Sequence, residues 1–174
     1  PIPTPPRYPP RMPQALPDTP ALRFTRRDGV HILETELLLP RPRAEVFPFF
    51  ADARNLEAIT PASLRFTILT PPPITMRPGA IIDYRLRISG VPTRWRTEIT
   101  SWEPPLRFVD EQRRGPYRLW IHEHRFEERD GGTLVADRVR YAVPGGAPVE
   151  RVLVRPRLRE IFTFRRAELA RIFA

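Results

Sequence analysis

Hydrophobic and polar residues alternate along most of the chain from His31 onward, which is the pattern of strands that bury one face. The first run, residues 31–39, ends at Pro40. Its buried face would comprise Leu33, Thr35, Leu37 and Leu39. Six further runs follow between residues 63 and 143, separated by proline and glycine turn signals. Together these runs predict an antiparallel meander of seven strands.

Two segments have helical periodicity instead. Between the first and second strands, residues 41–61 carry a phenylalanine-rich cluster interrupted by Pro48, which predicts two short helices joined by a kink. After Pro144 one apolar stripe continues to the end of the chain. It comprises Leu158, Ile161, Phe162, Leu169, Ile172 and Phe173. The stripe predicts a long C-terminal helix that starts or bends at Pro156.

This order of elements predicts an α+β fold in which a curved antiparallel sheet exposes one face to water and packs the other against the C-terminal helix. A single helix over a strongly curved sheet leaves a void. The faces follow from the charges, because arginines such as Arg85 and Arg87 alternate with apolar residues. The predicted inner wall includes Tyr84, Trp95, Leu106, Phe108, Asp110, Gln112, Asp137 and Tyr141.

The strand at residues 117–126 is the critical assignment. One of its faces carries Trp120, His122, His124 and Phe126, and the other carries Tyr117, Leu119, Ile121, Glu123 and Arg125. We predict that the first set faces the helix, because its aromatic rings bury more apolar area and the charged residues of the second set favour water. Two histidines then lie inside the sheet.

Buried polar groups need partners, and several arrangements satisfy this need. The favoured interpretation is a network in which an aspartate across the sheet holds each histidine. The same residues could instead form the polar end of a ligand cavity, or a catalytic pair. His122 and His124 could also bind one metal ion with Asp110 or Asp137, but a hydrogen-bonded cluster is favoured, and we expect neither a metal nor a cofactor.

Arg165 lies near the apolar stripe of the C-terminal helix, three residues after Phe162. We predict that both residues line the ligand cavity if Arg165 points inward, and that Phe162 lines it in either case. We favour a guanidinium that reaches solvent at the edge of the stripe. The alternative is that it enters the cavity and pairs with a carboxylate or an acidic ligand.

Composition narrows the function classes. The chain of 174 residues has no cysteine and a formal net charge of +9, and all 29 basic residues are arginine. The arginines are spread along the strands, which argues against nucleic acid binding. Residues 1–22 are proline-rich and are expected to form a disordered arm, with a ligand-binding domain at 23–174. We expect a cytoplasmic protein without a membrane span, and peripheral membrane contact and oligomeric state stay open.

Four stretches carry a resemblance to a known superfamily. They are residues 46–61 (VFPFFADARNLEAITP), 76–126, 131–144 (GGTLVADRVRYAVP) and 161–169 (IFTFRRAEL). Together they resemble the START-like or SRPBCC superfamily, in its cyclase/dehydrase and ligand-binding branch. The resemblance implies a helix-grip fold, with a seven-stranded sheet around a long C-terminal helix and a hydrophobic ligand cavity. The superfamily includes lipid carriers, quinone-binding proteins and polyketide aromatase/cyclases.

The leading hypothesis is therefore a protein that binds or carries a hydrophobic small molecule, such as a lipid, quinone or polyketide-like aromatic. The alternative is an aromatase/cyclase-type enzyme. In it His122 and His124 would act as base and acid, Tyr84 or Tyr141 would donate a hydroxyl hydrogen bond, and Arg165 would anchor the substrate. A third hypothesis is an interaction module that uses the proline arm and the basic surface. No GxSxG, phosphate-binding glycine loop or HExxH motif is present.

Overall fold

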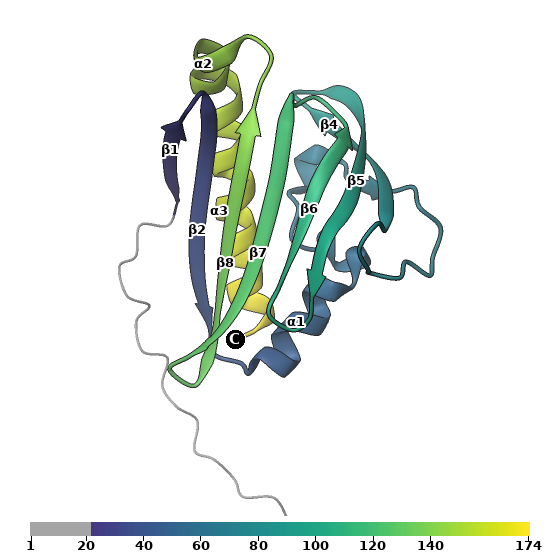
Figure 1. Cartoon of the computed structure of the whole chain (residues 1–174), viewed down its shortest axis with the longest axis vertical. Helices are drawn as coiled ribbons and strands as arrows, with labels where there is room; N and C mark the ends of the chain where they lie inside the picture. Colours follow the sequence, from purple (N-terminus) through teal and green to yellow (C-terminus); the bar gives the residue numbers. More distant parts are fainter. Residues whose placement is uncertain (1–21) are drawn as a thin grey trace, which may run out of the picture.

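The computed structural model describes residues 22–174, so nearly all of the predicted proline-rich arm lies outside the described residues. The described chain forms one antiparallel sheet, with helical segments on one of its faces (Figure 1). The strands are β1 (Arg23–Arg27), β2 (Val30–Leu39), β3 (Thr67–Ile68), β4 (Ile81–Ile88), β5 (Val91–Glu103), β6 (Arg107–Arg114), β7 (Leu119–Arg129) and β8 (Gly132–Ala142). Their order across the sheet is β1-β2-β8-β7-β6-β5-β4-β3.

The predicted α+β architecture is confirmed, but the described sheet has eight strands where seven were predicted. The additional strand is β1, which pairs with β2 through a tight hairpin. Asp28 and Gly29 form this turn with φ values of 50° and 80°, the positive values that the favoured two-residue hairpin turns require. The Asp-Gly pair was thus the sequence signal for the missed strand.

Short helical segments connect β2 to β3. They are the α-helix α1 (Arg43–Ala51) and two 3₁₀ turns, η1 (Ala53–Leu56) and η2 (Ala62–Leu64). Pro48 lies inside α1 without ending it, so the predicted kink between two helices is replaced by the change to a 3₁₀ turn at Ala53. The first of the six predicted runs, which begins at residue 63, is mostly irregular, and only its short strand β3 pairs with β4.

The C-terminal helical run begins ten residues before Pro156. It comprises α2 (Gly146–Val149), a π-helical turn η3 (Glu150–Val154) and α3 (Arg155–Ile172). Proline has no N–H and its ring clashes with the carbonyl four residues earlier, so the wider π turn accommodates Pro156 at the start of α3. The prediction that the long helix starts at Pro156 is therefore confirmed for α3 to within one residue, but the helical run as a whole begins earlier, at Gly146.

The inner face of the sheet is covered in two halves. Phe162 and Leu158 of α3 pack on β2 and β8, where they meet Leu33 and Val139. Helix α1 packs on the central strands, where Phe47 and Phe50 meet Phe126. The other half, over β4 and β5, is covered by the irregular segment after α1. Buried residues of this second half are Ala53, Leu64, Phe66, Ala80, Ile82, Leu86, Trp95 and Ile99. A seam therefore runs between the helix and the irregular segment.

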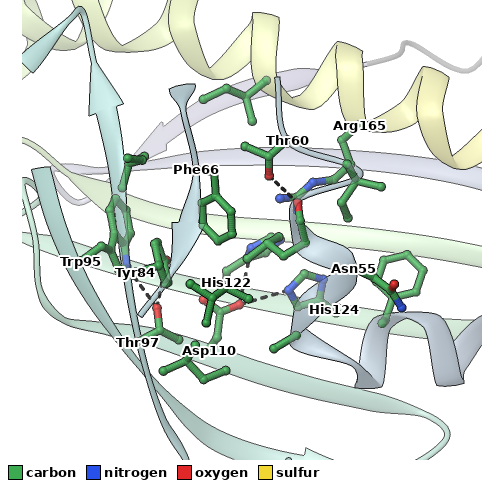
Figure 2. Close-up of a pocket in the computed structure, with 18 of the residues that line it drawn as sticks. Asn55, Thr60, Phe66, Tyr84, Trp95, Thr97, Asp110, His122, His124 and Arg165 are labelled. Carbon is green, nitrogen blue, oxygen red and sulfur yellow. Dashed lines mark hydrogen bonds and ion pairs between the residues drawn. The ribbon is translucent and has the colours of Figure 1, made fainter. Parts of the chain in front are cut away.

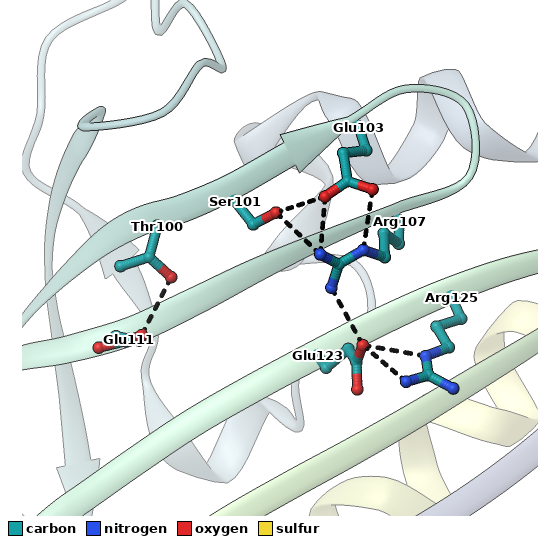
Figure 3. Close-up of polar contacts among 7 residues, drawn as sticks. All are labelled: Thr100, Ser101, Glu103, Arg107, Glu111, Glu123 and Arg125. Carbon is teal, nitrogen blue, oxygen red and sulfur yellow. Dashed lines mark hydrogen bonds and ion pairs between the residues drawn. The ribbon is translucent and has the colours of Figure 1, made fainter.

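Arginine–carboxylate pairs follow the outer face of the sheet (Figure 3). Arg107 of β6 lies 2.7 Å from Glu103 and 3.2 Å from Glu123 of β7, and Arg125 also contacts Glu123 at 2.9 Å. This arrangement confirms that the arginines alternating along the strands lie on the solvated face. Leu106 was predicted to face inward, but it lies in the turn before β6 and is 52% exposed.

A buried polar cluster fixes the π turn to the sheet. The side chain of Glu150 is 1% exposed and accepts hydrogen bonds from the Tyr141 hydroxyl at 2.7 Å and from Arg155 at 2.9 and 3.0 Å. His31 Nδ1 lies 3.6 Å from the same carboxylate. Burial alone would raise the pKa of Glu150, but the hydrogen bonds from Arg155 and Tyr141 outweigh it and lower the pKa. Glu150 therefore stays ionised inside the fold.

We predict that Glu150→Gln lowers the free energy of unfolding at pH 7 by about 2–3 kcal/mol, the contribution of hydrogen bonds to a charged group. Because the pKa of Glu150 is lower in the folded state, its stabilisation is complete above the ordinary value of 4.5 and is lost as the pH falls through the folded value. Urea unfolding between pH 7 and 3 measures both effects. Glu160→Gln is the control, because Glu160 is 50% exposed and pairs with Arg157 at the surface.

Candidate functional site

A largely apolar pocket of about 180 Å³ lies in the seam between the sheet, α3 and the segment after α1 (Figure 2). Nine of the predicted site residues line it. They are Tyr84, Trp95, Phe108, Asp110, Trp120, His122, His124, Phe162 and Arg165. The assignment of the β7 faces is confirmed, since His122, His124 and Phe126 are all buried and Arg125 is exposed.

Aromatic rings form one wall of the pocket. Tyr84 stacks on Trp95 with ring centroids 5.8 Å apart, and Trp95 meets Trp120 edge to face at 5.3 Å. The indole N–H of Trp95 donates to Thr97 Oγ1 at 3.0 Å, and the Tyr84 hydroxyl lies 3.1 Å from the same oxygen. Burial raises the pKa of Tyr84, so its phenol stays protonated. This wall thus presents ring surface and satisfies its own polar atoms.

Tyr117 also belongs to this wall, although it was predicted to face outward. It precedes β7, so the alternation of the strand does not apply to it, and its ring packs 4.7 Å from that of Trp120. Gln112 was predicted to line the cavity but does not. Its amide donates to the Tyr117 carbonyl at 2.7 Å and accepts from the Tyr117 N–H at 3.2 Å. Gln112 therefore holds Tyr117 in position from outside the pocket.

Four polar side chains form a closed cluster at the sheet end of the pocket. His122 and His124 project from β7, while Asp110 comes from β6 and Asp137 from β8. His122 Nε2 lies 3.0 Å from Asp137 Oδ1, and His124 Nε2 lies 3.1 Å from Asp110 Oδ2. His124 Nδ1 is 2.8 Å from Asp137 Oδ1, off the axis of a good hydrogen bond, and His122 Nδ1 is 3.6 Å from Asp110 Oδ2. Each imidazole thus contacts both carboxylates.

The cluster separates the pKa values of its members. Burial lowers the pKa of His122, and the neighbouring His124 lowers it further. Burial also acts to lower the pKa of His124, but its bonds to Asp110 and Asp137 outweigh this effect and raise it. Burial acts to raise the pKa of Asp137, yet the bonds from both histidines hold it well below its usual range. A neutral His122 beside a protonated His124 and an ionised Asp137 fits these directions.

Two further predicted site residues lie outside the pocket lining. Asp137 is behind the two imidazoles, on the side away from the cavity, and contacts both of them. The Tyr141 hydroxyl donates to Glu150 at the π turn, and burial raises its pKa. Tyr141 is therefore a structural residue of the helix-side core.

Arg165 is buried, which makes the prediction that it reaches solvent wrong. Its side chain lines the pocket, with Cζ 5.1 Å from the centroid of the Phe162 ring. Among the described residues, Nε has no hydrogen-bond acceptor. Arg165 thus brings a cation with an unused donor to the apolar pocket.

The irregular segment after α1 supplies part of the lining that was not predicted from the sequence. Asn55 and Thr60 come from the segment predicted as a short helix, and Phe66 comes from a predicted strand that is irregular in the structure, so neither pattern indicated which side chains face the pocket. Leu158 and Ile161 of α3 also line the pocket, and their place on the apolar stripe was the signal that could have identified them.

Within residues 22–174, no helix combines the length and the hydropathy that crossing a bilayer requires.

Comparison with protein families gives one match. The family model described as polyketide cyclase / dehydrase and lipid transport matches residues 39–167. No curated protein matches the sequence significantly.

Solved structures share the fold at low sequence identity. Protein Ms6760 of Mycobacterium smegmatis is 19% identical with a TM-score of 0.61, and the match covers 81% of this chain and 89% of that one. The major latex-like protein 151 of Panax ginseng is 11% identical with a TM-score of 0.62, covering 83% and 97%. The Zhui aromatase/cyclase of Streptomyces sp. R1128 is 13% identical with a TM-score of 0.63, covering 81% and 92%.

We predict that Asp137→Ala lowers the free energy of unfolding by about 3–5 kcal/mol, because it leaves both buried imidazoles without the carboxylate between them. Urea unfolding at pH 7 in the presence of a chelator measures the change. Asp83→Ala is the matched control, since Asp83 pairs with Arg96 on the outer face with side chains 36% and 51% exposed. The control should cost about 1 kcal/mol or less. Equal losses in the two variants would contradict the assigned role of Asp137.

Proposed function

The chain belongs to the polyketide cyclase / dehydrase and lipid transport family, and on that premise we propose that it binds a compact hydrophobic molecule in the pocket beside α3. The observation that carries the proposal is the composition of the pocket wall. Aromatic and aliphatic side chains dominate it, and a few polar groups converge at one end, as in small-molecule sites generally.

The size of the pocket favours a compact ligand. Its volume of about 180 Å³ is below the roughly 300–1,000 Å³ of pockets that hold drug-sized molecules. An apolar cavity of roughly 150 Å³ accommodates a benzene ring. The pocket as it stands therefore fits one or two fused aromatic rings, such as the head of a quinone or a short aromatic polyketide, better than a long acyl chain.

Arg165 gives the proposed ligand an orientation. A buried guanidinium with an unused donor favours an acidic or carbonyl oxygen, and the apolar surroundings strengthen that interaction. The aromatic wall of Trp95 and Tyr84 would then take the ring system. We infer a ligand that is apolar at one end and carries an oxygen acceptor at the other.

An aromatase/cyclase-type reaction is the second candidate, and the fold shared with the Zhui aromatase/cyclase is the observation that favours it. His122, His124 and Tyr84 line the pocket, where they would act in this case as base, acid and hydroxyl donor. Every ring nitrogen of the two histidines, however, contacts a carboxylate, and the Tyr84 hydroxyl contacts Thr97. Binding therefore ranks above catalysis.

We predict that Ile161→Trp, which fills the pocket from α3, weakens binding of 2-naphthol about tenfold or more. Isothermal titration calorimetry measures the affinity. Leu153→Trp is the matched control, because Leu153 is 66% exposed on the π turn and lies outside the pocket lining. Unchanged binding in the Ile161 variant, or no binding of any compact aromatic to the native protein, would refute the proposed function.

A second prediction concerns the charge at Arg165. Arg165→Met is expected to weaken binding of 2-naphthoate about 10- to 100-fold, because it removes a hydrogen bond to a charged group. Binding of the neutral analogue 2-naphthol should change about twofold or less. Calorimetry with both ligands separates the two effects, and an equal loss for both would show that Arg165 acts through packing alone.

A further inference from the structure

The buried cluster at the sheet end of the pocket also has the composition of a metal centre. Asp110, His122 and His124 each offer one ligand atom, and these atoms lie within 4.8 Å of one another. We propose that Asp110 Oδ2, His122 Nδ1 and His124 Nε2 bind a divalent transition-metal ion such as Zn²⁺. Two imidazoles and one carboxylate suit zinc and its neighbours in the first row. This site does not depend on an organic ligand in the pocket.

Two of the three distances suit a coordination shell, and the third ligand pair, His122 Nδ1 and His124 Nε2, lies within 4.8 Å. His124 Nε2 and His122 Nδ1 lie 3.1 and 3.6 Å from Asp110 Oδ2. Ligands about 2.1 Å from a tetrahedral zinc ion are about 3.4 Å from one another, as the edges of that tetrahedron. An ion can therefore occupy the centre of this triangle with small movements of the side chains.

Asp137 supports the two histidines from behind, in the way carboxylates support metal-bound imidazoles. Its Oδ1 is hydrogen-bonded to His122 Nε2 at 3.0 Å and lies 2.8 Å from His124 Nδ1, off the axis of a good hydrogen bond; these two nitrogens face away from Asp110. A carboxylate only accepts hydrogen bonds, so it favours a proton on each of these nitrogens. The lone pairs of neutral imidazoles then point toward Asp110, as ligation requires.

Charge also favours a divalent ion. Asp110 and Asp137 are two carboxylates at the sheet end of an apolar pocket, where unpaired charge is costly. With both imidazoles neutral, an ion of charge +2 makes the cluster of four side chains neutral overall.

The open side of the proposed ion faces the pocket. The three ligand residues line the cavity, whereas Asp137 lies on the opposite side of the imidazoles. Figure 2 shows Asp110, His122 and His124 grouped at one end of the cavity. A water molecule or an oxygen atom of a bound compound could therefore complete the coordination from the pocket side.

The test uses the full chain, stripped with EDTA and then titrated with Co²⁺ as a coloured probe, followed by competition with Zn²⁺. We expect one ion per chain and the visible absorption of four- or five-coordinate cobalt. His124→Phe and Asp110→Ala should each weaken binding about 100-fold or more, and Asp137→Asn about 10- to 100-fold with the absorption bands retained.

His31→Gln is the control variant, because His31 is the remaining histidine of the chain and contacts Glu150 outside the cluster. It should leave the Co²⁺ affinity unchanged within about twofold. Circular dichroism establishes that each variant is folded. If His124→Phe does not fold, Asp110→Ala carries the test, because Asp110 is less buried than His124. Binding of less than one ion per chain, or equal affinity in Asp110→Ala and the native protein, would overturn the proposal. Neither result would count against the proposed binding of a hydrophobic molecule, because the affinity for 2-naphthol is measured separately.

Discussion

The inner face of the sheet is wider than one helix can cover, and this mismatch determines where the pocket lies. Strands are about 4.8 Å apart and a helix with its side chains is about 10 Å wide, so one helix covers two or three strands. α3 covers β2 and β8, and the rest of the face needs a different cover. Helix α1 and the irregular segment after it supply this cover, and they do not meet α3 completely.

The seam falls over the central strands, and the polar residues of the inner face gather there. His122 and His124 come from β7 and their aspartates from the strands on either side. Groups of this kind are costly in a closed core, because each must be paired without water. Beside a cavity the same groups can exchange partners with a ligand, an ion or water. The chain thus concentrates its buried polarity where its packing is least complete.

The period-two pattern was sufficient to predict the side chains that strands carry. It placed His122, His124 and Trp95 on the inner face, because a strand fixes the direction of every second residue. It failed where that rule does not apply. Tyr117 and Leu106 lie at strand ends, and their orientations depend on the local turn.

Longer-range packing accounts for the other differences. No local signal shows that residues 52–66 fold back over the sheet, because the period of a helix or strand does not determine which part of the sheet it packs on. Arg165 was expected in solvent because a charge at the edge of a helical stripe usually reaches water. The gap beside α3 gives it an interior position instead, and a gap of this kind depends on the width of the whole sheet.

Within residues 22–174 the sheet is open, so β1 and β3 each have an unpaired edge, and the two edges differ in sequence. β1 carries Arg23, Arg26 and Arg27, all exposed, so a second strand that docked there would meet a row of like charges. At the opposite margin β3 has only two residues, and three prolines at 71–73 soon follow it. Both margins thereby resist the strand addition that leads to aggregation, and the sheet can stay unclosed around a hollow without recruiting neighbouring molecules.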